Sequence, residues 1–192
     1  ILKAAEEVRD SAKNLDGFFH QGEVVAEPVD LNHVVERVVD YTRPRWQDQA
    51  REKGIAIRVT TSLKIIPPVG GDGTELETAL THLVTNAIEA LPKGGTIFIS
   101  SRAKDDSVLL EIRDTGKGMS EATRRHCLEP FFSTKEEPSA GMGLTVVSAT
   151  VHRHRGKLAI DSRPGSATRV TMTLPVWALP DEEDDSDSGL PA

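Results

Sequence analysis

Residues 108–118 read Val-Leu-Leu-Glu-Ile-Arg-Asp-Thr-Gly-Lys-Gly, an alternation of apolar and polar residues that leads into a glycine-bearing turn. This alternation predicts a strand in which Asp114 lies on the apolar side, together with Val108, Leu110 and Ile112. A carboxylate on that side needs a hydrogen-bond donor. Two donors are suitable: the main-chain amides of the turn 115–118, or the exocyclic amino group of an adenine. Gly116 and Gly118 would let a ligand approach the main chain closely.

Helices and strands alternate on both sides of this segment. Periodicity and capping residues predict helices over 30–42, 74–91, 120–127 and 144–154, with Asp30 and either Asp72 or Thr74 as caps. Alternation predicts further strands over 55–60, 96–102, 157–162 and 168–174. Pro44 should end or kink the first helix, and we expect Glu27-Pro28 and 67–71 to be a break and a loop. The sum is an α+β fold, a two-layer sandwich in which helices cover one face of a mixed sheet.

The expected helix over 74–91 carries four polar residues on the face opposite its apolar stripe, namely Glu75, His82, Asn86 and Glu89. Asn86 is a poor helix former in the middle of a helix. Its amide oxygen is a suitable ligand for Mg²⁺, which takes a few protein oxygens together with phosphates and water. The alternative is an ordinary solvated helix face.

The loop over 129–143 combines two features of an anion site. Phe131 and Phe132 could anchor it by burial, and hydroxyls and a cation follow in Ser133-Thr134-Lys135. Gly141-Met142-Gly143 then precedes a helix expected to begin near Leu144, and a helix N-terminus attracts anions. The alternative is a plain surface loop, since glycines commonly mark loops.

Composition excludes several classes of protein. The 192 residues are 38% hydrophobic but only 4% aromatic, so aliphatic side chains must fill the core. The one cysteine, Cys127, cannot form an internal disulfide, and no run approaches 18 apolar residues. We therefore expect a cytoplasmic chain without membrane contact. Six of the acidic residues lie within 181–187, so the remainder of the chain carries a net charge of only -1 out of the total of -7. Nothing in this charge favours nucleic acid as a partner.

The two ends differ from the middle of the chain. Residues 1–20 have a heptad seam formed by Ile1, Ala5, Val8, Ala12, Leu15 and Phe19. A helix with this seam either folds back on its own domain or belongs to a bundle or dimer stalk. We expect residues 1–22 to end such a helical bundle, 23–178 to form one domain, and 179–192 to be an acidic disordered tail or linker.

Five motifs in order resemble the ATP-binding domain of sensor histidine kinases, whose GHKL or Bergerat fold is shared with type II topoisomerases, the Hsp90 chaperones and the MutL repair proteins. The resemblance covers about residues 28–176. The motifs are His82-Leu-Val-Thr-Asn86-Ala-Ile-Glu-Ala90, Asp114-Thr-Gly-Lys-Gly-Met119, Glu129-Pro-Phe-Phe-Ser-Thr-Lys135, Gly141-Met-Gly-Leu144 and Gly165-Ser-Ala-Thr168.

The resemblance implies a role for each motif. Asn86 would bind a Mg²⁺ ion that bridges the ATP phosphates, and Lys135 would neutralise phosphate charge; these two would be the catalytic residues. Asp114 would accept from the adenine amino group, with support from Thr168 through its hydroxyl or a water. The residues shaping the base pocket would be Gly116, Gly118 and Met119. The residues of a lid over the phosphates would be Thr134, Lys135, Gly141, Met142, Gly143 and Leu144.

The resemblance also implies partners. Residues 1–20 resemble the second helix of a dimerisation and phosphoacceptor bundle, so we expect a homodimer through that stalk. None of the six histidines precedes Glu or Asp, as a phosphoaccepting histidine of these kinases usually does. The γ-phosphoryl group would therefore pass to a histidine upstream of residue 1, and then to an aspartate of a response regulator.

Three residues depart from the family pattern, and in two of these departures, Ser139 and Arg155, the residue replaces a frequent glycine. His82 stands where these proteins often have Glu or Asn, and it would orient a water or a phosphate, or have a structural role. The alternatives are a GHKL ATPase clamp, a serine-phosphorylating switch kinase, or a degenerate nucleotide-binding scaffold, which His82 alone would favour.

Overall fold

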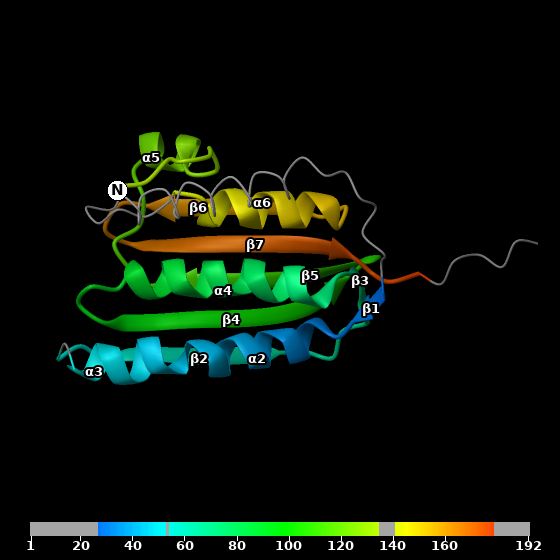
Figure 1. Ribbon diagram of the computed structural model, residues 1–192, viewed down its shortest axis with the longest axis horizontal. Helices are drawn as coiled ribbons and strands as arrows, with labels where there is room; N and C mark the ends of the chain where they lie inside the picture. The colour runs from blue at the N-terminus through cyan, green and yellow to red at the C-terminus, as the bar shows by residue number, and fades with distance from the viewer. Residues whose placement is uncertain (1–26, 53, 135–140, 179–192) are drawn as a thin grey trace, which may run out of the picture.

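The computed structural model describes residues 27–52, 54–134 and 141–178, which form a five-stranded sheet with helices on one face (Figure 1). The strand order is β2-β4-β5-β7-β6, with β2 parallel to β4 and the other pairs antiparallel. The strands span Ile57–Leu63 in β2, Gly95–Lys104 in β4, Ser107–Asp114 in β5, Lys157–Arg163 in β6 and Ala167–Pro175 in β7. This arrangement confirms the predicted mixed sheet.

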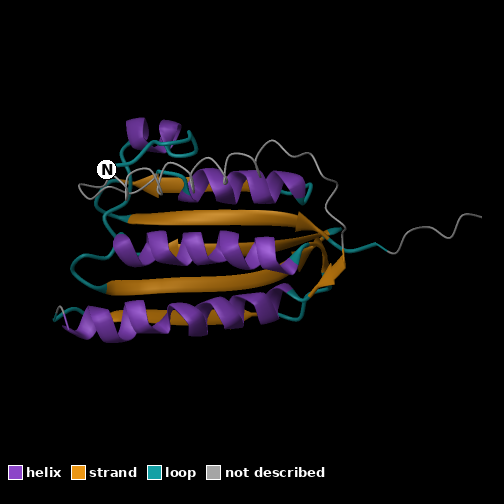
Figure 2. Cartoon of the chain, viewed as in Figure 1, coloured by secondary structure: helices purple, strands orange, loops and turns teal. Residues whose placement is uncertain are grey.

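Three helices lie side by side on one face of the sheet (Figure 2). They are α2 (Leu31–Arg43), α4 (Gly73–Glu89) and α6 (Gly143–Arg153), and the short α5 (Glu121–His126) follows the loop after β5. Asp30 caps α2 by accepting from the His33 amide, and Asp72 caps α4 by accepting from the amides of Thr74 and Glu75. Of the two alternative caps that the sequence offered for α4, Asp72 and Thr74, the structure selects Asp72.

The core lies between this helical layer and the sheet. Burial alternates along β5, so Val108, Leu110, Ile112 and Asp114 face the helices as predicted. The largest fully buried side chains come from both layers: Leu31, Leu76, Leu80, Leu91, Ile97, Ile99, Leu110, Met172 and Leu174. These aliphatic contacts confirm the two-layer α+β sandwich.

The predicted end or kink at Pro44 is confirmed, whereas the predicted loop over 67–71 needs correction. Helix α2 ends at Arg43, but the chain keeps winding as a π-helical segment η1 (Pro44–Gln49) and a short α3 (Ala50–Glu52). Pro44 has a helical φ of -56° and begins the new segment, where its missing N–H does little harm. Within 67–71, Val69–Gly71 forms β3, which pairs antiparallel with β1 (Glu27–Val29). That pairing joins segments about 40 residues apart, so local pattern could not predict it.

Several expectations lie outside the described residues, namely the helix over 1–20, the acidic stretch 181–187 and Lys135. Within the described part of the chain, no helix has both the length and the apolar character that a membrane span requires.

Candidate functional site

Asp114 ends β5 with its carboxylate in the core, 4% exposed. Its Oδ1 accepts a hydrogen bond from the Gly116 amide at 2.7 Å. Burial raises the pKa of Asp114, and the main-chain amides of Gly116 and Thr168 oppose this shift. A turn amide thus satisfies one carboxylate oxygen, as one of the two sequence hypotheses expected. The adenine hypothesis concerns the remaining hydrogen-bonding capacity of the carboxylate, which has two oxygens with two lone pairs each.

The loop from Asp114 to Met119 needs its two glycines for steric reasons. A Cβ on Gly116 would lie 2.2 Å from the Ala90 carbonyl oxygen, at the end of α4. Gly118 has a φ of +62°, and a Cβ there would lie 2.0 Å from the Arg163 carbonyl oxygen. The main chain of this loop therefore packs between the end of α4 and the turn that joins β6 to β7.

Thr168 is paired with Asp114 across β5 and β7, so the structure brings these two predicted residues together. The Thr168 hydroxyl lies 2.9 Å from the hydroxyl of Ser162, which also accepts from the Met119 amide at 2.8 Å. Sequence reasoning missed Ser162, because its importance follows from the register of β6 against β7.

Asn86 and His82 lie against the first residue of α6. A Cβ on Gly143 would lie 3.5 Å from His82 Nδ1 and 3.7 Å from Asn86 Nδ2. Met142, which precedes this helix, makes no side-chain cap. The part of the polar face of α4 that carries His82 and Asn86 therefore adjoins the predicted glycine-led N-terminus of α6. The first main-chain amides of α6, which have no partner within the helix, lie near the Asn86 side chain.

The other end of that polar face lies away from the site. Glu75 forms an ion pair with Arg153 at 3.0 Å, near the C-terminus of α6. The face of α4 is therefore partly covered by α6 and is not an ordinary solvated face, although Glu89 is exposed.

The loop over 129–134 differs from its prediction. The Phe131 side chain is 59% exposed, and only Phe132 is half-buried, with its ring 5.9 Å from the His126 ring. Phe131 has a φ of +65°, and its main chain lies so close to Gly141 that a Cβ there would be 2.6 Å from the Phe131 carbonyl carbon. Phe131 and Gly141, which lie ten residues apart in the sequence, thus meet through main-chain contact. Thr134 is exposed, Met142 is buried and Leu144 is half-buried.

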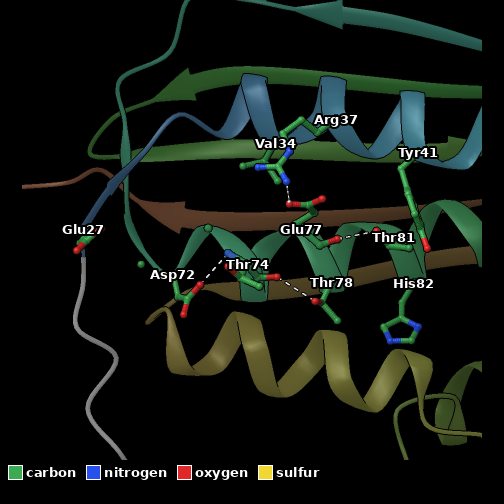
Figure 3. Close-up of a pocket in the computed structure, with 12 residues that line it drawn as sticks. Glu27, Val34, Arg37, Tyr41, Asp72, Thr74, Glu77, Thr78, Thr81 and His82 are labelled. Atoms are coloured by element: carbon green, nitrogen blue, oxygen red, sulfur yellow. Dashed lines mark hydrogen bonds and ion pairs between the residues drawn. The ribbon is translucent and has the colours of Figure 1, made fainter.

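A cavity of about 800 Å³ lies between α2 and α4 and reaches His82 (Figure 3). An ion pair of 2.9 Å between Arg37 and Glu77 spans it, and Gly71 to Thr74 line its end near the start of α4. Among the described residues, His82 is the only predicted ligand-binding residue that lines it. The cavity is therefore distinct from the surroundings of Asp114.

The described residues around Asn86 offer few ligands for magnesium. Within 27–52, 54–134 and 141–178, no three His, Cys, Asp or Glu side chains cluster as a metal site. An amide oxygen suits Mg²⁺ that is held mainly by phosphates and water, and the neighbouring helix N-terminus would attract the phosphates. The donor set thus fits a nucleotide-bound ion.

Comparison with known proteins identifies a matching family and related kinases. The family model described as "Histidine kinase-, DNA gyrase B-, and HSP90-like ATPase" matches residues 71–178. Sporulation kinase E of Bacillus subtilis is 38% identical over 112 residues, which are 58% of this chain and 15% of that kinase. The histidine-protein kinase/phosphatase MprB of Mycobacterium ulcerans is 34% identical over 169 residues, which are 83% of this chain and 31% of MprB. The chain thus spans less than a third of either relative.

Solved structures share the fold. The Acinetobacter baumannii histidine kinase AdeS superimposes with a TM-score of 0.71 and 25% identity, over 91% of this chain and 81% of that one. Full-length ShkA in complex with AMPPNP gives a TM-score of 0.69 and 25% identity, over 80% of this chain and 32% of ShkA.

Proposed function

Since this chain belongs to the family of histidine kinase-, DNA gyrase B- and HSP90-like ATPases, we propose that it is the ATP-binding catalytic part of a sensor histidine kinase. The observation that carries the proposal is the buried Asp114 carboxylate at the end of β5, beside a glycine loop and on the sheet face that is covered by α4, the helix that contains Asn86. An ionised acceptor in an apolar setting discriminates strongly for a ligand that brings a donor.

The adenine would bind at Asp114. Its amino group would donate to the carboxylate, with Gly116, Gly118 and Met119 along the base and Thr168 beside it. Gly116 and Gly118 fix the loop next to Asp114, because a side chain at either position would collide with main chain.

The phosphates would lie between α4 and the start of α6. Asn86 would supply an oxygen to Mg²⁺, which when bound neutralises phosphate charge. The amides that follow Met142 would donate to phosphate oxygens, with Gly141, Gly143 and Leu144 at the same end of α6. His82 would orient a phosphate or a water there. Thr134 and Lys135 would complete the lid.

The reaction would be transfer of the γ-phosphoryl group to a histidine of another segment. The bond between the γ-phosphorus and the bridging oxygen breaks, a phosphorus–nitrogen bond forms, and ADP leaves. The chain would contribute positioning and charge neutralisation. We propose that the acceptor histidine precedes residue 1 and that a response-regulator aspartate then receives the phosphoryl group in the cytoplasm. In this proposal residues 1–22 end a dimerisation helix bundle, residues 23–178 form the catalytic domain, and residues 179–192 form an acidic disordered tail or linker.

The test has a binding and a transfer part. Calorimetric titration with ATP, ADP and GTP, with and without magnesium, should show binding of adenine nucleotides over GTP. The chain, mixed with a separately prepared phosphoacceptor helix pair and γ-labelled ATP, should label the histidine of that pair. Absence of adenine-nucleotide binding would refute the proposal. Tight binding without transfer would favour a scaffold, and steady phosphate release without an acceptor would favour an ATPase.

A further inference from the structure

Ser162 lies at the end of β6 in a row of three polar residues that crosses the sheet. Asp114 of β5 is in register with Thr168 of β7, and Thr168 is in register with Ser162 of β6. The row begins at the buried carboxylate and ends at a serine that the sequence motifs do not include.

The hydrogen bonds of the Ser162 hydroxyl can be assigned by counting donors. A serine hydroxyl has one hydrogen and two lone pairs. The hydrogen goes to the Ala167 carbonyl oxygen at 3.1 Å, and the Met119 amide donates to one lone pair at 2.8 Å. The second lone pair is left for the hydroxyl of Thr168 at 2.9 Å. The Thr168 hydroxyl therefore donates to Ser162, and its own oxygen keeps only acceptor capacity.

The hairpin formed by β6 and β7 also contacts the loop from Asp114 to Met119 through main-chain atoms. The Gly165 amide donates to the Lys117 carbonyl oxygen at 2.7 Å, and Gly118 packs on the Arg163 carbonyl. The bond from the Met119 amide to Ser162 adds a third contact, at the last residue of the loop. Without this hydroxyl, the Met119 amide would lose its partner and Thr168 could rotate.

We propose that Ser162 is a positioning residue of the adenine site, which holds the Met119 amide in place and turns the Thr168 hydroxyl into an acceptor beside Asp114. The inference rests on the proposed function, because it assumes that the base binds at Asp114. Ser162 acts through Met119 and Thr168 and need not contact the nucleotide.

The test compares two nucleotides in three variants. Ser162→Ala removes the hydroxyl, Ser162→Thr retains it, and Ser100→Ala removes a hydroxyl from the face of β4 that points away from the helices. Calorimetry gives the affinity for ATP and for purine riboside triphosphate, which lacks the 6-amino group. Thermal unfolding without nucleotide reports stability separately.

We expect Ser162→Ala to weaken ATP binding about tenfold, the loss of roughly one hydrogen bond, and to weaken binding of the analogue much less. Ser162→Thr and Ser100→Ala should stay close to wild type. Equal affinities of Ser162→Ala and wild type for ATP, or equal losses for both nucleotides, would overturn the inference. If the alanine variant does not fold, Ser162→Cys allows the same comparison. Failure of the wild type to bind either nucleotide would instead refute the proposed function.

Discussion

The main-chain amide of Asp72 donates a hydrogen bond to Nε2 of His154, 3.0 Å away, and so joins the start of α4 to the end of α6. The other ring nitrogen, Nδ1, lies 2.7 Å from the Thr150 carbonyl oxygen. Arg153 and Glu75 form an ion pair in the same region. Since α4 and α6 are antiparallel, these contacts hold one end of the helix pair, and Gly143 meets His82 and Asn86 at the other.

Replacing His154 with alanine should lower the free energy of unfolding by about 2–4 kcal/mol. The substitution leaves a cavity at a residue that is 4% exposed, and it removes the acceptor of the Asp72 amide. Urea denaturation measures the change. His152→Ala, at an exposed position of the same helix, should change stability by less than about 0.5 kcal/mol. Equal effects of the two variants would contradict this role.

Gly143→Ala should weaken nucleotide binding without lowering stability. The new Cβ makes ordinary contacts with His82 and Asn86, and alanine is the better helix former, so stability should hold or rise slightly. The methyl group would occupy space beside Asn86, so ATP binding should weaken several-fold. The matched control is Gly73→Ala, because Gly73 is the first residue of α4 and its Cβ would lie 3.8 Å from Val29. The hypothesis fails if Gly143→Ala binds ATP as the control does.

Asp114→Asn should weaken ATP binding at least tenfold, because an amide replaces a charged acceptor of the adenine amino group. The chain should still fold, within about 1 kcal/mol of wild type without nucleotide, since the asparagine Oδ1 can accept from the Gly116 amide. Calorimetry and urea denaturation give the two values. Asp161→Asn, an exposed change on β6, serves as control. Wild-type affinity in Asp114→Asn would exclude the adenine role.

Because the pKa of Asp114 is raised, stability and ATP affinity should change in opposite directions with pH. The folded chain keeps this proton to a higher pH than the unfolded chain, so the contribution to stability is present below the ordinary value of 3.8 and is lost as pH rises through the raised pKa. Adenine binding needs the carboxylate, so ATP affinity should fall as pH decreases through that same range. Comparing the pH profiles of wild type and Asp114→Asn isolates this effect. Parallel profiles would show that another group is responsible.

Asn86→Ala should reduce the magnesium dependence of ATP binding while leaving the fold intact. The change removes one oxygen ligand and leaves the ion with phosphates and water alone. A magnesium titration at fixed ATP measures it, and Asn86→Asp should retain much of the dependence because it keeps an oxygen. Thr78→Ala, at an exposed position of α4, is the control. An unchanged magnesium titration in Asn86→Ala would remove this residue from the metal site.

Local pattern was sufficient for most elements of the domain. The alternation in 108–114 correctly placed Asp114 on the helix side, and the capping residues correctly placed the starts of α2 and α4. Phe131 shows the limit of such reasoning: its aromatic side chain suggested burial, but the side chain is exposed and it is the Phe131 main chain that contacts Gly141.

The sequence by itself determined the two-layer architecture and the side of the strand that carries Asp114, because side-chain periodicity and capping act within a few residues. Only the tertiary structure decided that Ser162 adjoins Thr168, that His154 holds the start of α4, and that Gly143 faces Asn86. Those relationships depend on strand register and on the packing of α4 against α6, which join residues 82 positions apart in the case of His154 and Asp72. Contacts between such distant segments leave no periodic trace in the chain.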